Sequence, residues 1–158
     1  MAKTGRGIQV GLSWIPARNG RIPKNAVCVP FYYYVARCKH GGHWVPGNAV
    51  EGYKVCYYAD DGKQLSSKEF ELLCETGISD TKECYEWIPD SDGKVPKNAI
   101  VAGMKGDKAL YIVKAMINCE PSIGKLQEGD KYACFTWTGG KVEEHRANQY
   151  DVLVFKQE

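Results

Sequence analysis

Residues 14–27 read WIPARNGRIPKNAV, and residues 87–100 read WIPDSDGKVPKNAI. The two stretches share the opening Trp-Ile-Pro, a central glycine, a second proline and the closing Lys-Asn-Ala. Most of the remaining differences are conservative. Chance does not produce such a match, so the chain contains an internal repeat, and each repeat is a structural unit that packs against its neighbour.

The repeat continues beyond this opening, with a separation that grows along the chain. Small insertions explain the growth, because loops tolerate them at little cost in free energy. We therefore predict two units, at residues 8–75 and 84–156. Equivalent positions of the two repeats are 73 residues apart at the opening. They are 77 residues apart for Tyr34 with Tyr111 and for Arg37 with Lys114, and 78 apart for Cys56 with Cys134. At the end of the repeats, residues 70–73 match residues 150–153 at a separation of 80.

Aromatic and β-branched residues cluster in short runs, which is typical of strands. Hairpin turn signals separate these runs, and only residues 66–74 resemble a helix, weakly. The prolines bracket these short strands and restrict them to sheet edges or turn positions. The strand runs and turn signals together predict an all-β protein in which two antiparallel repeats form one compact unit. The runs are residues 32–37, 53–58, 70–73, 110–113, 131–137 and 150–155, and the turn signals are Asn19-Gly20, Asp61-Gly62, Asp92-Gly93 and Gly139-Gly140.

The composition favours a globular protein that has no transmembrane segment and does not bind nucleic acid. The 158 residues carry a net charge of +2 from 21 basic and 19 acidic side chains, without a basic run. No stretch approaches 18 apolar residues, so we expect no transmembrane segment. The N-terminus lacks an apolar signal region, so we expect a cytoplasmic protein whose seven cysteines are reduced. The alternative is a protein that leaves the cell by a leaderless route and is released or associates with the cell surface.

Four marks of each repeat resemble the DM-nine repeat family of invertebrate proteins. They are the Trp-Ile-Pro opening, a strand such as residues 110–115, a Pro-x-x-Gly-Lys or Pro-Gly-Asn turn, and the closing residues 70–73 or 150–153. The marks recur in order in both halves and cover nearly the whole chain. The resemblance implies two intertwined β repeats.

The resemblance also implies a function, because several two-repeat members of this family are mannose-recognising lectins. They are often dimeric and linked to innate immunity, pattern recognition or cell-surface recognition. For this chain we therefore expect a non-catalytic lectin that binds mannose or mannose-containing glycans as a homodimer. We expect no cofactor, no bound metal and no catalytic residue.

The second repeat offers an acid and a lysine suited to sugar recognition. Carboxylates accept hydrogen bonds from sugar hydroxyls and ammonium groups donate to them, and such charge-assisted bonds are strong. In the family pattern an acid and a lysine in the segment EPSIGK bind the sugar, and Glu120 and Lys125 match them. A further family acid precedes the previous strand, in a loop that is one residue shorter here. Asp107 is the best match for it, although Lys105 in that position would weaken the site.

The first repeat departs from this pattern and offers at most a degenerate second site. His43 stands where the acid is expected, and Asn48 where the lysine is expected. The loop before its strand, residues 28–31, contains no acid. We therefore expect one good sugar site in each chain.

Three other functions compete with the lectin prediction. The segment CKHGGH, residues 38–43, offers Cys and His ligands for zinc, but its spacing fits no standard zinc motif. A cysteine nucleophile paired with His43 or His145 would make an enzyme, yet no catalytic motif accompanies it. The third alternative is a cytosolic stress- or defence-response protein that binds a protein partner or vesicle and no sugar.

Overall fold

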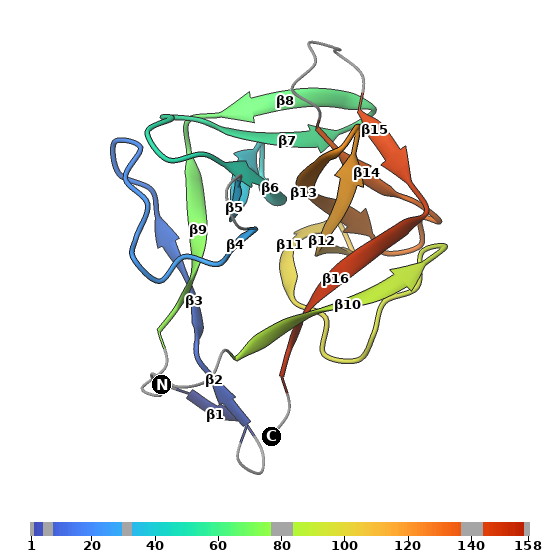
Figure 1. The fold of residues 1–158 in the computed structure, drawn as a ribbon, viewed down its shortest axis with the longest axis horizontal. Coiled ribbons are helices and arrows are strands. Elements are labelled where there is room, and N and C mark those ends of the chain that lie inside the picture. The colour runs from blue at the N-terminus through green and yellow to red at the C-terminus, as the bar shows by residue number, and fades with distance from the viewer. Residues whose placement is uncertain (1, 5–7, 30–32, 77–83, 137–143, 157–158) are drawn as a thin grey trace.

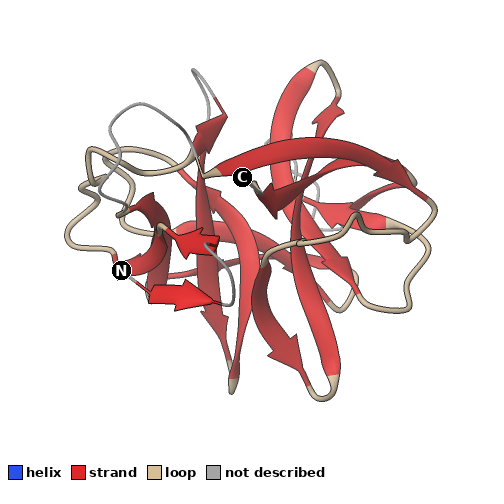
Figure 2. Ribbon diagram, turned by 90° about the horizontal axis from the view of Figure 1, so that it is seen from below, coloured by secondary structure: helices blue, strands red, loops and turns tan. Residues whose placement is uncertain are grey.

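The protein is built almost entirely from antiparallel β-sheet, as the sequence predicts. The computed structural model describes residues 2–4, 8–29, 33–76, 84–136 and 144–156. Within these ranges there is no helix, and residues 66–74 belong to strands instead (Figure 2). Accordingly, no described helix is long and apolar enough to cross a membrane.

The first repeat forms a seven-stranded sheet, in the order β3-β9-β5-β6-β7-β8, with β4 on β5 (Figure 1). Its opening strand β3 therefore pairs with its closing strand β9, which ties the two ends of the repeat together. The strands are β3 (Leu12–Pro16), β4 (Cys28–Val29), β5 (Tyr33–His40), β6 (His43–Ala49), β7 (Cys56–Asp60), β8 (Lys63–Ser67) and β9 (Phe70–Glu75).

The second repeat forms an equivalent seven-stranded sheet, in the order β10-β16-β12-β13-β14-β15, with β11 on β12. A separate hairpin of β1 (Ala2–Thr4) and β2 (Ile8–Val10) precedes both sheets. The strands of the second sheet are β10 (Tyr85–Ser91), β11 (Val101–Lys105), β12 (Lys108–Ile117), β13 (Glu120–Gln127), β14 (Ala133–Phe135), β15 (His145–Ala147) and β16 (Gln149–Phe155).

The two repeats interlock through a shared core, and each sheet is built from one repeat alone. One buried cluster combines Val27, Val35 and Leu73 of the first repeat with Ile112 and Leu153 of the second. Neither sheet could bury its apolar face alone at this size, because a small sheet needs a second layer. Trp14 and Trp87, the equivalent residues that open the two repeats, are half-buried and pack against this cluster.

Two-residue turns with positive φ join several strands, as the sequence predicts. Asp61 and Gly62 have φ of 50° and 79° between β7 and β8, the conformation that favours Asp-Gly in hairpins. Asn19-Gly20 and Asp92-Gly93 behave in the same way. Asn118-Cys119, between β12 and β13, has the same conformation and was not predicted. Gly139-Gly140 lies outside the described residues.

The segments that carry Pro-Gly-Asn and Pro-x-x-Gly-Lys are strands, although the sequence suggested turns. They form most of β6 and β13. Pro46 on β6 and Pro121 on β13 each lie in a part of the strand that pairs on one side only. The pairing of β6 with β7 begins at Gly47, and the pairing of β13 with β14 is limited to Lys125. The missing N–H of each proline therefore breaks no hydrogen bond on its open side.

The cysteines differ from the prediction in two respects. Cys38 on β5 and Cys56 on β7 form a disulfide, where reduced thiols were expected. The disulfide spans β6 at Gly47, where an added Cβ would lie 3.0 Å from the Cys38 sulfur. In addition, Tyr57 pairs with Asn48 as Cys134 pairs with Lys125, so the counterpart of Cys134 is Tyr57 and not Cys56.

Gly103 on β11 marks a close backbone approach between the repeats. A Cβ on this residue would lie 2.2 Å from the carbonyl oxygen of Trp44 on β6, whereas a Cβ on Gly42 would meet nothing within 4 Å. Since backbone cannot yield as a side chain can, we predict that Gly103→Ala lowers the free energy of unfolding by about 2–3 kcal/mol. Gly42→Ala is the matched control and should change it by less than about 0.5 kcal/mol. Urea denaturation followed by tryptophan fluorescence measures both, and equal stability of the two variants would contradict this packing.

Candidate functional site

Asp60 lies at the centre of a charged cluster where the two repeats meet. Its carboxylate is fully buried, and Oδ1 accepts hydrogen bonds from Lys125 Nζ at 2.5 Å and Lys105 Nζ at 3.2 Å. Lys105 also donates to Asp61 at 2.8 Å. Asp60 and Asp61 end the hairpin strand β7 of the first repeat, whereas both lysines come from the second. The cluster is thus an ion-pair network between repeats.

Two histidines approach the other oxygen of the same carboxylate. The Nε2 atoms of His40 and His43 lie 3.3 Å and 3.8 Å from Asp60 Oδ2. His40 Nδ1 makes a 2.7 Å hydrogen bond with the hydroxyl of Tyr58. Asp60 Oδ2 and His43 Nε2 are buried and have no hydrogen-bond partner among the described residues. These two atoms are therefore available to a ligand.

The surroundings of Asp60 keep it charged and His43 neutral. Burial alone would raise the pKa of Asp60, but the hydrogen bond and charge of Lys125, together with those of Lys105, lower the pKa of this carboxyl below its usual value. Burial lowers the pKa of His43 below its usual value, and His40, Lys105 and Lys125 act in the same direction, although Asp60 acts to raise it. Burial also raises the pKa of Tyr58, as does the charge of Asp60, so Tyr58 stays a hydroxyl at neutral pH.

The structure does not gather the predicted sugar-binding residues Asp107, Glu120 and Lys125 into one set. Lys125 is buried with its ammonium on Asp60, and Glu120 begins the same strand beside Ile117. Five residues along a strand correspond to about 17 Å, which separates the two side chains. Asp107 is exposed in the turn between β11 and β12, and Lys105 is the residue of that hairpin that reaches the cluster.

The two residues of the predicted degenerate site have separate roles. His43 belongs to the charged cluster. Asn48 is buried, accepts a hydrogen bond from the Ile123 backbone at 2.8 Å, and donates to Thr136 at 2.9 Å and Ser122 at 3.4 Å. Its amide is therefore occupied in joining the repeats.

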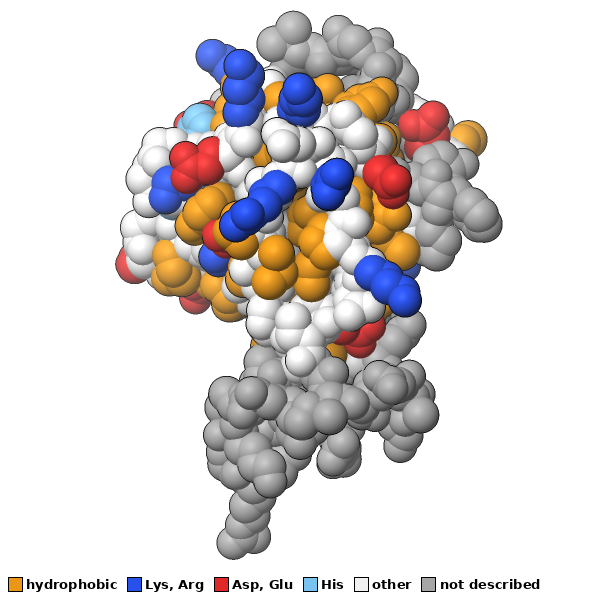
Figure 3. All heavy atoms as spheres, turned by 90° about the vertical axis from the view of Figure 1, so that its left-hand side faces the viewer, with side chains coloured by type: hydrophobic (Ala, Val, Ile, Leu, Met, Phe, Trp, Pro, Cys, Tyr) orange, Lys and Arg blue, Asp and Glu red, His pale blue; other side chains and the backbone are white. Residues whose placement is uncertain are grey.

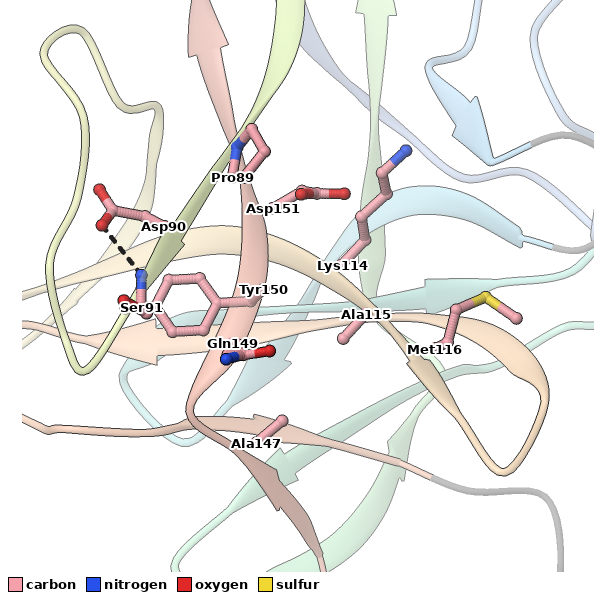
Figure 4. A pocket seen from close by; sticks show the side chains of 10 residues that line it. All are labelled: Pro89, Asp90, Ser91, Lys114, Ala115, Met116, Ala147, Gln149, Tyr150 and Asp151. Atoms are coloured by element: carbon pink, nitrogen blue, oxygen red, sulfur yellow. Dashed lines mark hydrogen bonds between the residues drawn. The ribbon is translucent and has the colours of Figure 1, made fainter.

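A shallow groove of about 690 Å³ opens on the second repeat (Figure 4). Its floor is formed by side chains of β10, β12 and β16, with a contribution from β15. Asp151 and Lys114 are direct cross-strand partners on β16 and β12 and project into the groove together. The lining residues are Pro89, Asp90, Ser91, Lys114, Ala115, Met116, Ala147, Gln149, Tyr150 and Asp151.

The groove differs from the equivalent surface of the first repeat, because its two facing charges do not form an ion pair with each other. There, Arg37 and Glu71 are cross-strand partners that form an ion pair, with the guanidinium 4.7 Å from the centre of the Trp14 ring. In the second repeat Lys114 lies over the Trp87 ring at 4.8 Å, and no ion pair with Asp151 forms within the described structure. The charges of the groove thus remain available to a ligand.

Three of the described free thiols have raised pKa values, which does not favour a cysteine nucleophile at those positions. Burial raises the pKa of Cys74 and Cys134, and burial followed by the charge of Glu75 raises that of Cys84. A nucleophilic cysteine needs a lowered pKa. The face of the first repeat in Figure 3 also mixes basic, acidic and apolar side chains, without the concentrated basic surface of a nucleic-acid binder.

The fold and its polar sites define a tandem-repeat, all-β protein whose two units share one core. The chain belongs to the DM9 repeat family, since the model of the DM9 repeat matches residues 31–144, as the sequence resemblance predicts. A solved structure with the same fold is that of the nematode sperm cell motility protein MFP2B, with a TM-score of 0.62 and 19% identity. The match covers 91% of this chain and 44% of that protein, so the chain spans less than half of it. No curated protein matches this sequence.

Removing the charge of Asp60 should strongly destabilise the protein, because Lys125 would remain buried without its counter-charge. We predict that Asp60→Asn lowers the free energy of unfolding by about 3–5 kcal/mol, and that Lys125→Met in the same chain restores much of the loss. Arg146→Met is the control, because the Arg146 side chain is 56% exposed beside the buried Glu144, and its loss should cost only about 1 kcal/mol. A double-mutant cycle by chemical denaturation checks this, and additive losses would show that the two charges are not coupled.

Proposed function

We propose that this protein is a non-catalytic lectin that recognises mannose-type glycans, and that the groove of the second repeat is its sugar site. The observation that carries the location is the uncommitted pair of Lys114 and Asp151 on a rigid sheet. Family membership supports the ligand class, as the resemblance to mannose-binding members implied.

The groove offers the chemistry that a hexose requires. The carboxylates of Asp90 and Asp151 can accept from neighbouring hydroxyls, while the ammonium of Lys114 can donate to their oxygens. Gln149 adds both a donor and an acceptor. Met116, 66% exposed at the groove, offers an apolar surface to the C–H groups of a sugar ring. The volume of about 690 Å³ lies within the range of small-molecule sites.

The charged cluster fits a sugar less well, although it contains the predicted Lys125. Lys125 and Asp60 are enclosed and bound to one another, so a sugar would have to separate a buried ion pair. In the groove no such pair must be broken. This contrast favours the groove over the site built on Asp107, Glu120 and Lys125.

Calorimetric titration of the protein with mannose and with galactose tests this proposal. We expect selective but weak mannose binding, with a Kd on the order of millimolar. Lys114→Ala and Asp151→Asn should each abolish the heat. Lys39→Ala is a matched control, because Lys39 lies over the Trp44 ring at 4.7 Å much as Lys114 lies over Trp87.

The titration also separates the competing proposals. Loss of mannose binding in Lys125→Met with retention in Lys114→Ala would move the site to the residues predicted from the sequence, provided circular dichroism shows the variant folded. No heat in the wild type at about ten times the expected Kd would contradict the lectin function. It would then favour the alternative of a protein or vesicle partner, which suits the structural similarity to MFP2B, a nematode sperm cell motility protein.

We further propose that the protein acts as a homodimer, because one weak site gives little retention on a glycan surface. Two linked sites can raise the effective affinity about 10²–10⁴-fold. Sedimentation velocity at working concentration should give the mass of two chains. A monomer, with no agglutination of mannan-coated beads, would contradict the dimer while leaving the monosaccharide site unaffected.

A further inference from the structure

We infer that His40, His43 and Asp60 form a binding site for a divalent transition metal ion, with Zn²⁺ as the best-matched ion. The site lies in the first repeat and is independent of the proposed sugar groove. Its three ligand atoms are the Nε2 atoms of the two histidines and Oδ2 of the aspartate.

The distances from Asp60 Oδ2 to the two histidines approach those of a tetrahedral ion. Zinc binds nitrogen and oxygen ligands at about 2.0–2.1 Å, which places two ligands of a tetrahedron about 3.3 Å apart. Asp60 Oδ2 lies 3.3 Å from His40 Nε2 and 3.8 Å from His43 Nε2. His43 lies outside the group in which the ligand atoms of His40, Asp60 and Asp61 are within 4.8 Å of one another, so the His43 ring must turn toward His40 to complete the set.

Two observations indicate that a ligand is missing from this cluster. Asp60 is fully buried, and its Oδ2 has no hydrogen-bond partner in the described structure, although both lysines bind Oδ1. His43 Nε2 is likewise buried and without a hydrogen-bond partner there. Because a buried polar atom without a partner destabilises the fold, an ion that bound both atoms would remove two such penalties.

The strands hold the ligands on rigid backbone. His40 and His43 are direct partners across the turn between β5 and β6, which places them on one face of the hairpin. Asp60 ends β7, the strand next to β6. Tyr58, two residues before it, bonds to His40 Nδ1 at 2.7 Å. Such an outer hydrogen bond fixes the ring and leaves Nε2 for the metal.

The fourth position of the ion would face solvent or Asp61. A carboxylate oxygen of Asp61 lies within 4.8 Å of the ligand atoms of His40 and Asp60. His40 is one-third exposed, so a water molecule can also reach the position. Two imidazoles, one carboxylate and one open position form a set that zinc and copper accept. Lys105 and Lys125 oppose a cation, so we expect binding weaker than that of a closed structural zinc site.

This site differs from the metal site that the sequence suggested. Cys38 of the segment CKHGGH is bound to Cys56 and is therefore unavailable as a thiolate. Asp60 replaces it, from a strand distant in sequence. The second repeat has Ile117 and Glu120 at the positions of His40 and His43, so we expect one metal ion in each chain.

Zinc titration of chelator-treated protein, with alkylated free thiols, tests the proposal. We expect one equivalent to bind the wild type and to raise its thermal midpoint. His40→Gln and His43→Gln should each weaken binding at least tenfold, while His145→Gln, at an exposed histidine on β15, should bind as the wild type does. Circular dichroism of the metal-free variants checks that they are folded.

Two spectroscopic measurements make the test independent of these variants. Cobalt(II) should give visible bands without a thiolate charge-transfer band, and nuclear magnetic resonance should show zinc-dependent shifts of the His40 and His43 ring nitrogens. Unchanged zinc affinity in both glutamine variants would overturn the proposal. So would a spectrum of thiolate ligation, or zinc shifts confined to His145.

Discussion

Two equivalent side chains, Asn48 and Lys125, hold the repeats together, and much of the remaining structure depends on them. Each occupies the same place in its sheet, opposite Val35 or Ile112, and each reaches into the other repeat. Asn48 bonds to Ser122, Ile123 and Thr136, while Lys125 bonds to Asp60. These contacts are buried, where an unpaired polar group is costly, so they fix how the two sheets can pack.

Contacts within each repeat could be predicted from the sequence, whereas contacts between the repeats could not. The repeat, the all-β fold and most hairpin turns could be predicted, because they depend on local residue types such as Asp61-Gly62 and on self-similarity. The strand character of the segment around Pro121 could not, since proline usually marks turns, and only the missing strand partner on one side makes it acceptable here. The sequence also could not show which residue pairs with Lys125, because its partner Asp60 belongs to the other repeat.

The candidate sites were predicted less well than the fold for the same reason. A charged cluster made from β5, β6, β7, β11 and β13 leaves no local pattern in the sequence. Glu120 and Lys125 are close in sequence, but an extended strand separates them, whereas a turn would have brought them together. The sequence offered His40 and His43 as zinc ligands together with Cys38, and the disulfide with Cys56 removes Cys38 from that set. The useful signal would have been Asp60-Asp61 at a hairpin end together with a histidine pair across another hairpin.

Differences between the repeats indicate how one ancestral unit can serve two purposes. Cys38 and Cys56 in the first repeat stand at the positions of Ala115 and Ala133 in the second, so the disulfide was gained or lost as a unit. Arg37 and Glu71 are closed into an ion pair, whereas Lys114 and Asp151 are not. The first repeat thus keeps Arg37, Glu71 and the disulfide engaged in its own structure and retains an unpaired carboxylate oxygen beside two histidines. The second repeat contributes its buried lysine to the interface and leaves Lys114 and Asp151 without an ion pair to each other. A polar group that is already paired has little free energy left to offer a ligand, so the places where pairing is incomplete are the places where this protein can bind one.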